Sequence, residues 1–217
     1  MPDFSENEEM YLKRIFEIHN ESPGDIVKNT QLSEKMGISP ASTTEMIQRL
    51  SEREMITHIP YRGFRLTPEG FQLAARIKRR EVLLQILLSD IVGFQGDVGE
   101  VACKMEHAGG KELETALDRL LGYPQRAPDG SSIPSMQRDF HEIGVGTLLP
   151  IGKLPEGYSS SVELIIANDS EKITIREAGV SVGSEITNLG GKLTCSGSSL
   201  EFSREIGMKI LARVNSL

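Results

Sequence analysis

The chain has 217 residues and a formal net charge of -7 at pH 7, a length that accommodates one large or two small domains. Its longest apolar run, residues 83–88, is far shorter than the roughly 20 residues that span a bilayer, which excludes a membrane-spanning helix and favours a cytoplasmic protein. Two cysteines, Cys103 and Cys195, are too few for a disulfide framework.

The acidic charge is distributed unevenly along the chain. Residues 1–80 hold 12 basic and 12 acidic side chains, whereas residues 81–217 hold 12 basic and 19 acidic ones. Within residues 28–65 the basic side chains outnumber the acidic ones by six to four. Because binding to nucleic acid depends on local positive charge, only the first third of the chain is suited to meet DNA.

The first third reads as a run of short helices. Ser5 and Glu8 have the spacing of a capping box, and the apolar residues that follow recur at helical spacing over residues 6–19. Residues 30–36 form a second helix, which Gly37 ends. Ser39 and Pro40 then fit the N-cap and first position of a third helix. Two short helices that meet across Gly37 predict a helix-turn-helix.

The next segments predict a β-hairpin and then a helical domain. Residues 56–59 and 64–67 are β-prone and are joined by a short cationic turn, so the helix-turn-helix becomes a winged helix. A long apolar helix is expected from Pro68 to about Ile91, as a dimer interface. Two further helices follow at residues 97–105 and 111–121.

The C-terminal part has a different texture. Residues 123–135 contain three prolines and are expected to form an extended linker. Beyond them, short apolar runs at residues 162–166, 172–175 and 208–211 alternate with glycine and serine, a pattern that favours a small β-barrel. The predicted domains are therefore residues 1–75, 76–143 with the linker, and 144–217.

One short motif carries candidate metal chemistry. Cys103, Glu106 and His107 lie at positions i, i+3 and i+4 of a predicted helix, which places all three side chains on one face. Thiolate, imidazole and carboxylate are good donors to divalent transition metals. By spacing alone the motif favours a packed thiol beside two solvated polar residues over a metal site, because short ligand patterns have many false positives.

The order of these features resembles the diphtheria toxin repressor family of iron-dependent regulators. The resemblance is carried by Glu-Met-Tyr-Leu at residues 9–12, Tyr-Arg-Gly-Phe-Arg-Leu-Thr at 61–67, Ala-Cys-Lys-Met-Glu-His at 102–107 and Val-Gly-Ser-Glu-Ile at 182–186. It implies three parts: a winged helix-turn-helix, a helical dimerisation domain and an SH3-like β-barrel.

The resemblance also implies specific site residues. The family's primary metal site corresponds to Met10, Cys103, Glu106 and His107. Its ancillary site corresponds to Glu81, Gln85 and Gly99, where both expected imidazoles are missing, and to Asp169 and Lys172 in the C-terminal domain. This second site is therefore expected to bind transition metals poorly.

For DNA, the family's recognition helix corresponds to residues 39–53. The DNA-contacting residues implied are Ser39, Ala41, Thr44, Glu45 and Arg49 in that helix, with Arg62 and Arg65 in the wing. Serine at a helix N-terminus and arginine are suited to phosphate, and Glu45 to the amino group of cytosine.

These observations predict a homodimeric, non-enzymatic transcriptional repressor that binds palindromic operator DNA when loaded with divalent metal. Thioether and thiolate favour Fe²⁺, although Mn²⁺, Co²⁺, Ni²⁺ or Zn²⁺ are expected to substitute in vitro. An alternative is a winged-helix regulator that senses a small molecule or thiol oxidation through Cys103. A hydrolase with Cys103 as nucleophile is disfavoured, since no oxyanion-hole motif accompanies it.

Overall fold

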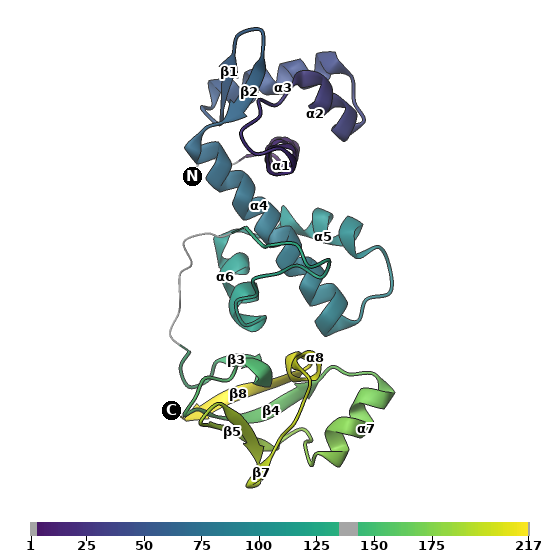
Figure 1. The fold of residues 1–217 in the computed structure, drawn as a ribbon, viewed down its shortest axis with the longest axis vertical. Coiled ribbons are helices and arrows are strands. Elements are labelled where there is room, and N and C mark those ends of the chain that lie inside the picture. The colour runs from purple at the N-terminus through teal and green to yellow at the C-terminus, as the bar shows by residue number, and fades with distance from the viewer. Residues whose placement is uncertain (1–3, 135–142, 217) are drawn as a thin grey trace. The chain divides into compact units, whose positions relative to one another are not determined.

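The computed structural model describes residues 4–134 and 143–216. The chain divides into two compact units. The first comprises the described residues up to Glu81 together with Glu106–Ala108 and Pro134. The second comprises Val82–Met105, Gly109–Ile133 and the described C-terminal residues. Figure 1 shows the helices and strands of each unit.

The first unit is the predicted winged helix. Its helices are α1 (Glu6–Glu21), α2 (Asn29–Met36), α3 (Pro40–Glu52) and the first part of α4 (Pro68–Ile86). The Ser5–Glu8 capping box begins α1, and Ser39 caps α3 with Pro40 as its first residue. These boundaries agree with the capping patterns in the sequence because short polar side chains satisfy the first free amides of a helix.

The wing is the antiparallel hairpin of β1 (Ile56–Ile59) and β2 (Gly63–Leu66). The backbone of Phe64 exchanges two hydrogen bonds with Val27, at 3.1 and 2.9 Å, which fastens the hairpin to the segment before α2. Gly63 makes this approach possible. A Cβ atom at Gly63 would lie 2.2 Å from the Val27 carbonyl oxygen, and its φ of +133° also favours glycine.

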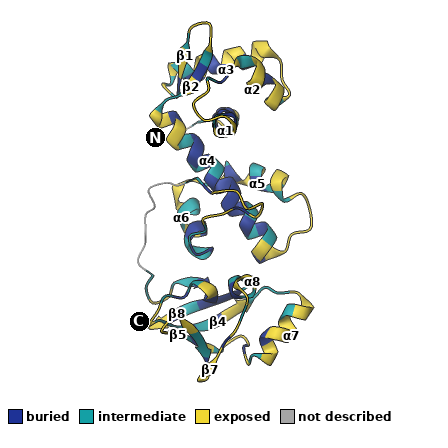
Figure 2. Ribbon diagram, in the orientation of Figure 1, coloured by how far each residue is buried: buried dark blue, intermediate teal, exposed yellow. Residues whose placement is uncertain are grey.

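A single apolar core joins the helices and the wing of the first unit. Leu12 and Ile15 of α1 are fully buried, as are Leu32 of α2 and Leu50 of α3, and Phe64 brings the wing into the same core. Figure 2 shows buried residues on α1 and along much of α4. The core therefore fixes the exposed faces of α3 and the wing relative to α1.

The second unit begins with a helical part. The end of α4 continues as a π-helical turn (Leu87–Val92), followed by α5 (Val98–Glu106) and α6 (Lys111–Leu120). Residues 123–134 do not form the expected extended linker. They make turns closed by a bridge between Arg126 and Ser132, and they bury Ala127 and Ile133 against the helices. Residue 135, the end of the predicted linker, lies outside the described residues.

The C-terminal part of the second unit is an antiparallel sheet with strand order β3-β8-β4-β5-β6-β7, consistent with the expected SH3-like fold. The strands are β3 (Leu148–Pro150), β4 (Ser159–Ile165), β5 (Glu185–Leu189), β6 (Lys192–Cys195), β7 (Ser198–Ser199) and β8 (Ile210–Ser216). A short 3-10 turn (Ile151–Lys153) follows β3, and α8 (Arg204–Met208) precedes β8.

The strand predicted at residues 172–175 is wrong, because this segment lies in helix α7 (Asp169–Glu177). Asn168 and Glu171 form a complete capping box at the helix start. That cap stabilises a helix nucleus and outweighs the β-propensity of Ile173, Thr174 and Ile175.

Across the described ranges, no helix combines the length and the apolar character needed to cross a bilayer.

Candidate metal centre and DNA-binding surface

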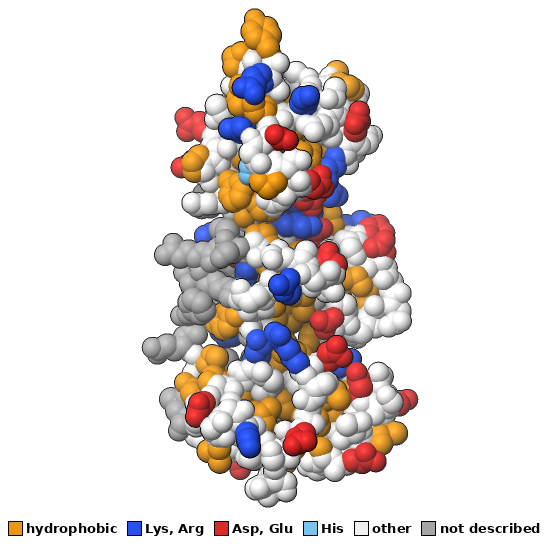
Figure 3. Space-filling view, viewed as in Figure 1, with side chains coloured by type: hydrophobic (Ala, Val, Ile, Leu, Met, Phe, Trp, Pro, Cys, Tyr) orange, Lys and Arg blue, Asp and Glu red, His pale blue; other side chains and the backbone are white. Residues whose placement is uncertain are grey.

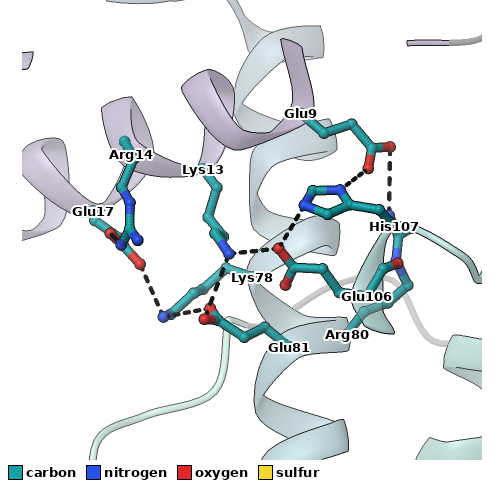
Figure 4. Close-up of polar contacts among 9 residues, drawn as sticks. All are labelled: Glu9, Lys13, Arg14, Glu17, Lys78, Arg80, Glu81, Glu106 and His107. Carbon is teal, nitrogen blue, oxygen red and sulfur yellow. Dashed lines mark hydrogen bonds and ion pairs between the residues drawn. The ribbon is translucent and has the colours of Figure 1, made fainter. Parts of the chain in front are cut away.

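A network of buried charges surrounds Glu106 at the end of α5 (Figure 4). The Lys13 ammonium donates to Glu106 Oε1 at 2.5 Å and lies 3.4 Å from Glu81 Oε1. Lys78 in turn pairs with the other oxygen of Glu81 at 2.7 Å and with Glu17 at 2.9 Å. Carboxylates and ammonium groups therefore alternate along the network, and the desolvation of each group is offset in part by a neighbouring opposite charge.

His107 is anchored at the other side of Glu106. Its Nδ1 lies 2.7 Å from Glu9 Oε2, and Arg80 lies 3.5 Å from the other oxygen of Glu9. Arg80 also donates to the backbone carbonyl of Glu106 at 3.1 Å. Because a carboxylate accepts, the contact with Glu9 places a proton on Nδ1, and an imidazole that binds a metal in this orientation would use the lone pair of Nε2.

Two atoms of this network that could bind a metal are buried and make no hydrogen bond within the described parts of the chain: Glu106 Oε2 and His107 Nε2. His107 Nε2 lies 3.3 Å from Glu106 Oε1, so the two side chains adjoin. Buried polar atoms are nearly always hydrogen-bonded, and exceptions point to a bound ion or water. Carboxylate oxygen and imidazole nitrogen both suit a divalent transition metal, so these two residues fit the expected centre.

The other two predicted ligands are placed only in part. Met10 is half-buried on α1, directly after Glu9, in the first unit. Cys103 is half-buried and in no disulfide, lies one turn before Glu106 on α5, and is assigned to the second unit. Among residues 4–134 and 143–216, no three His, Cys, Asp or Glu side chains gather closely enough to hold a metal ion. The structure thus brings Glu106 and His107 together without completing the set.

Burial raises the pKa of Glu106 from 4.5 to about 7, although the neighbouring Lys13 ammonium acts in the opposite direction. Desolvation disfavours the charged carboxylate, whereas a nearby cation favours it. A divalent cation at Oε2 would favour the ionised form further. The site therefore holds a carboxylate whose charge is not fully stabilised by the protein alone.

Of the residues that correspond to the ancillary site, Glu81 is already paired with cations. Both oxygens of Glu81 face ammonium groups, those of Lys13 and Lys78. Gln85 and Gly99 lie in the second unit. In the C-terminal domain, Asp169 and Lys172 form an exposed ion pair with each other, 3.6 Å apart on α7.

All predicted DNA-contacting residues are exposed. At the start of α3, the hydroxyl of the capping residue Ser39 accepts from the Ser42 amide at 3.1 Å. The Thr44 hydroxyl accepts from Asn29 at 2.6 Å and donates to the Pro40 carbonyl at 2.8 Å. The remaining positions are Ala41, Glu45 and Arg49 in α3, with Arg62 and Arg65 in the wing. This placement keeps the proposed reading face of α3 open to solvent.

The wing adds a polar hollow of about 480 Å³ that includes Lys28, Arg62 and Arg65 in its lining. Arg65 donates to the Gly24 carbonyl at 2.6 Å, which ties the wing to the loop before α2. In Figure 3, hydrophobic atoms form the tip of the wing, and lysine and arginine side chains lie directly below it. Tyr61 is fully exposed in the turn of the hairpin.

The sequence reasoning missed the residues that hold the site: Glu9, Lys13 and Arg80. A signal for Lys13 was available. It lies between Leu12 and Ile15 on α1, and a lysine among the buried positions of an amphipathic helix indicates a buried ion pair. The partner of such a lysine cannot be read from sequence, because Glu106 is 93 residues away.

Two protein-family models match the chain. Residues 3–64 match the family description "Iron dependent repressor, N-terminal DNA binding domain". Residues 67–135 match "Iron dependent repressor, metal binding and dimerisation domain". Together these matches cover more than half of the chain.

The chain is also similar along nearly its whole length to individual proteins. It is 32% identical to the diphtheria toxin repressor of Corynebacterium glutamicum, with 93% of each chain covered. It is 26% identical to the iron-dependent repressor IdeR of Mycobacterium tuberculosis, with 86% of this chain and 85% of the relative covered. The crystal structure of T. acidophilum IdeR has a TM-score of 0.52 and 24% identity, covering 99% of this chain and 100% of that chain.

Proposed function

Since the chain belongs to the iron-dependent repressor family of transcriptional regulators, we propose that Fe²⁺ is the metal that switches its DNA binding on. Its N-terminal part is a DNA-binding domain, and its middle part is a metal-binding and dimerisation domain. The protein is a repressor and not an enzyme. We further propose that it acts in the cytoplasm as a homodimer on palindromic operator DNA.

The proposed ligands are Met10, Cys103, Glu106 and His107. The observation that carries this proposal is that two buried atoms able to bind a metal, Glu106 Oε2 and His107 Nε2, make no hydrogen bond among the described residues. Glu9 supports it, because a carboxylate that holds the far nitrogen of a histidine fixes the ring for metal binding. Thioether and thiolate donors favour iron over manganese.

The proposed coupling runs through α1. Glu9 of this helix holds His107, and Met10 follows it, so a metal bond would join α1 to the end of α5. Leu12 and Ile15 of the same helix are part of the core that carries α3 and the wing. A ligand that clamps two elements favours the conformation in which both contribute, and linkage requires DNA to tighten metal binding equally.

On the DNA side, we propose that each protomer places α3 in a major groove and the wing on the adjacent backbone. Ser39 and Arg49 suit phosphate, as do Arg62 and Arg65 in the wing. Glu45 is the proposed reader of a cytosine. Ala41 and Thr44 lie on the same exposed stretch of α3.

The test is anaerobic DNA binding measured by fluorescence anisotropy. The probe is a duplex selected from random sequence with the Fe(II)-loaded protein. We expect Fe(II) to raise the DNA affinity of the wild type by about 5–150-fold, the usual range of allosteric coupling. His107→Ala and Cys103→Ala should lose this increase, whereas Glu100→Gln, an exposed change on α5, should keep it. Equal affinity with and without metal in the wild type contradicts the proposal.

Two further arms separate the alternatives. Sedimentation of the metal-loaded protein on DNA should give two chains per duplex. Hydrogen peroxide is added to metal-free protein and DNA, in the wild type and in Cys103→Ser. If peroxide changes the affinity of the wild type alone, Cys103 is a thiol sensor and the metal proposal is wrong.

A further inference from the structure

Lys13 is fully buried although it carries a charge. It comes from α1, and its ammonium faces one carboxylate from α4, Glu81, and one from the end of α5, Glu106 (Figure 4). Lysine is almost never fully buried unless it is paired, and its desolvation is offset only by close opposite charge. The two carboxylates therefore account for the burial of Lys13.

The two carboxylates are neutralised to different extents. Glu81 has an ammonium at each oxygen, Lys13 at Oε1 and Lys78 at Oε2. Glu106 has Lys13 at Oε1, while its Oε2 makes no hydrogen bond within the described part of the chain. The lysine thus closes one side of the Glu106 carboxylate and leaves the other side open.

We propose that Lys13 is a built-in cation of the Glu81–Glu106 pair, which prevents a divalent ion from bridging these two carboxylates and limits the chain to one metal ion. Carboxylate pairs bind divalent cations at oxygen distances of about 2.0–2.6 Å, and the Lys13 ammonium stands where such an ion would bind Oε1 of both residues. The expectation of one metal ion per chain rests on the proposed function. The position from which a bridging ion is excluded rests only on the contacts of Lys13.

The test counts bound Mn(II), added alone, by equilibrium dialysis and by electron paramagnetic resonance of the bound ion. The wild type and Lys13→Arg should bind one ion per chain, because both retain the internal cation. Lys13→Met, which has a similar length and no charge, should bind two. The double variant with Glu81→Gln should return to one, because the bridging pair then lacks a carboxylate.

Stability provides a second measurement. Lys13→Met and Lys13→Gln should melt at a lower temperature than the wild type without metal, and saturating Mn(II) should raise their melting temperatures more than that of the wild type. If neither variant folds even with saturating Mn(II), a divalent ion cannot replace the ammonium and the inference is wrong.

The outcomes distinguish this inference from the proposed function. A wild type that binds one ion and a Lys13→Met variant that also binds one overturn the inference and leave the metal centre intact. A wild type that binds none, with one ion in Lys13→Met, contradicts the metal centre and supports the inference.

Discussion

The first unit presents its charges in two contrasting ways. Around Glu106, four acidic and four basic side chains are joined with His107 in one network, and several of them are fully or nearly buried. On α3 and the wing, Arg49, Arg62 and Arg65 are exposed, and no ion pair to a carboxylate is seen for them among the described residues.

The difference separates two kinds of function. In a buried network, each charge is stabilised mainly by its paired opposite charge, so one added divalent ion changes the stability of the whole network strongly. Exposed cations are hydrated and contribute little until a phosphate approaches, and their effect then depends on salt. The buried network is suited to switching, and the exposed cations are suited to binding.

The comparison is tested most strongly by removing a buried cation. Lys13→Ala leaves Glu106 and Glu81 without their shared ammonium, so the free energy of unfolding should fall by about 3–5 kcal/mol in metal-free protein. Lys104→Ala, which removes an exposed pair with Glu100 on α5, should change it by less than about 1 kcal/mol. Urea denaturation measures both, and equal losses would show that burial does not distinguish the pairs.

The second prediction concerns pH. The pKa of Glu106 in the folded protein is about 7, above the ordinary value of 4.5, so the folded state holds this proton more tightly than the unfolded chain does. Its contribution to stability is then largest below pH 4.5 and is lost as pH rises to about 7. Relative to Glu106→Gln, metal-free wild type should lose about 3 kcal/mol over this range.

Denaturation curves at matched pH values for the two proteins measure that difference directly. The comparison with Glu106→Gln removes the titration of groups that do not interact with Glu106. A constant difference across the range would mean that Lys13 compensates Glu106 fully and that the network is already neutral at every pH.

A smaller effect is expected from the residue that positions His107. Glu9→Gln keeps a hydrogen-bond partner for Nδ1 and removes the charge, so metal affinity should fall by about 10–100-fold. DNA affinity at saturating metal should stay unchanged, because Glu9 makes no proposed DNA contact. Calorimetric titration with Co(II) gives the first quantity and anisotropy the second. An unchanged metal affinity would remove Glu9 from the site.

The smallest effect is expected on the exposed side. Arg62→Ala should lower DNA affinity at all sequences alike and reduce the slope of log affinity against log salt by about 1. Arg176→Ala, an exposed arginine on α7, is the matched control and should leave the slope unchanged. An altered sequence preference in Arg62→Ala would mean that the wing reads bases.

Sequence reasoning succeeded where the determinant is local. The caps at Ser5 and Ser39 fixed the starts of α1 and α3 because each cap needs only the next three residues. It failed where two local preferences compete, as in α7, where the Asn168 cap prevails over Ile173 and Ile175.

At the candidate site, the sequence predicts that Glu106 and His107 adjoin, but it does not identify the residues that contact them. The motif at Glu106 and His107 is local, whereas Lys13 and Glu9 reach these residues from α1 through contacts between segments distant in sequence. The turns at residues 123–134 were missed for the same reason, because Ile133 is buried by helices far from it in the chain.

The hydrogen bonds between Val27 and Phe64 have a consequence for the operator. They join the hairpin to the segment before α2, and the shared core joins α3 to the hairpin, so α3 and the wing form one rigid DNA-binding element. A switch that acts on α1 then changes the orientation of this element as a whole and leaves its internal structure unchanged. Loss of metal should therefore broaden the tolerated spacing between the two halves of the proposed palindromic operator, while the preferred bases within each half stay the same.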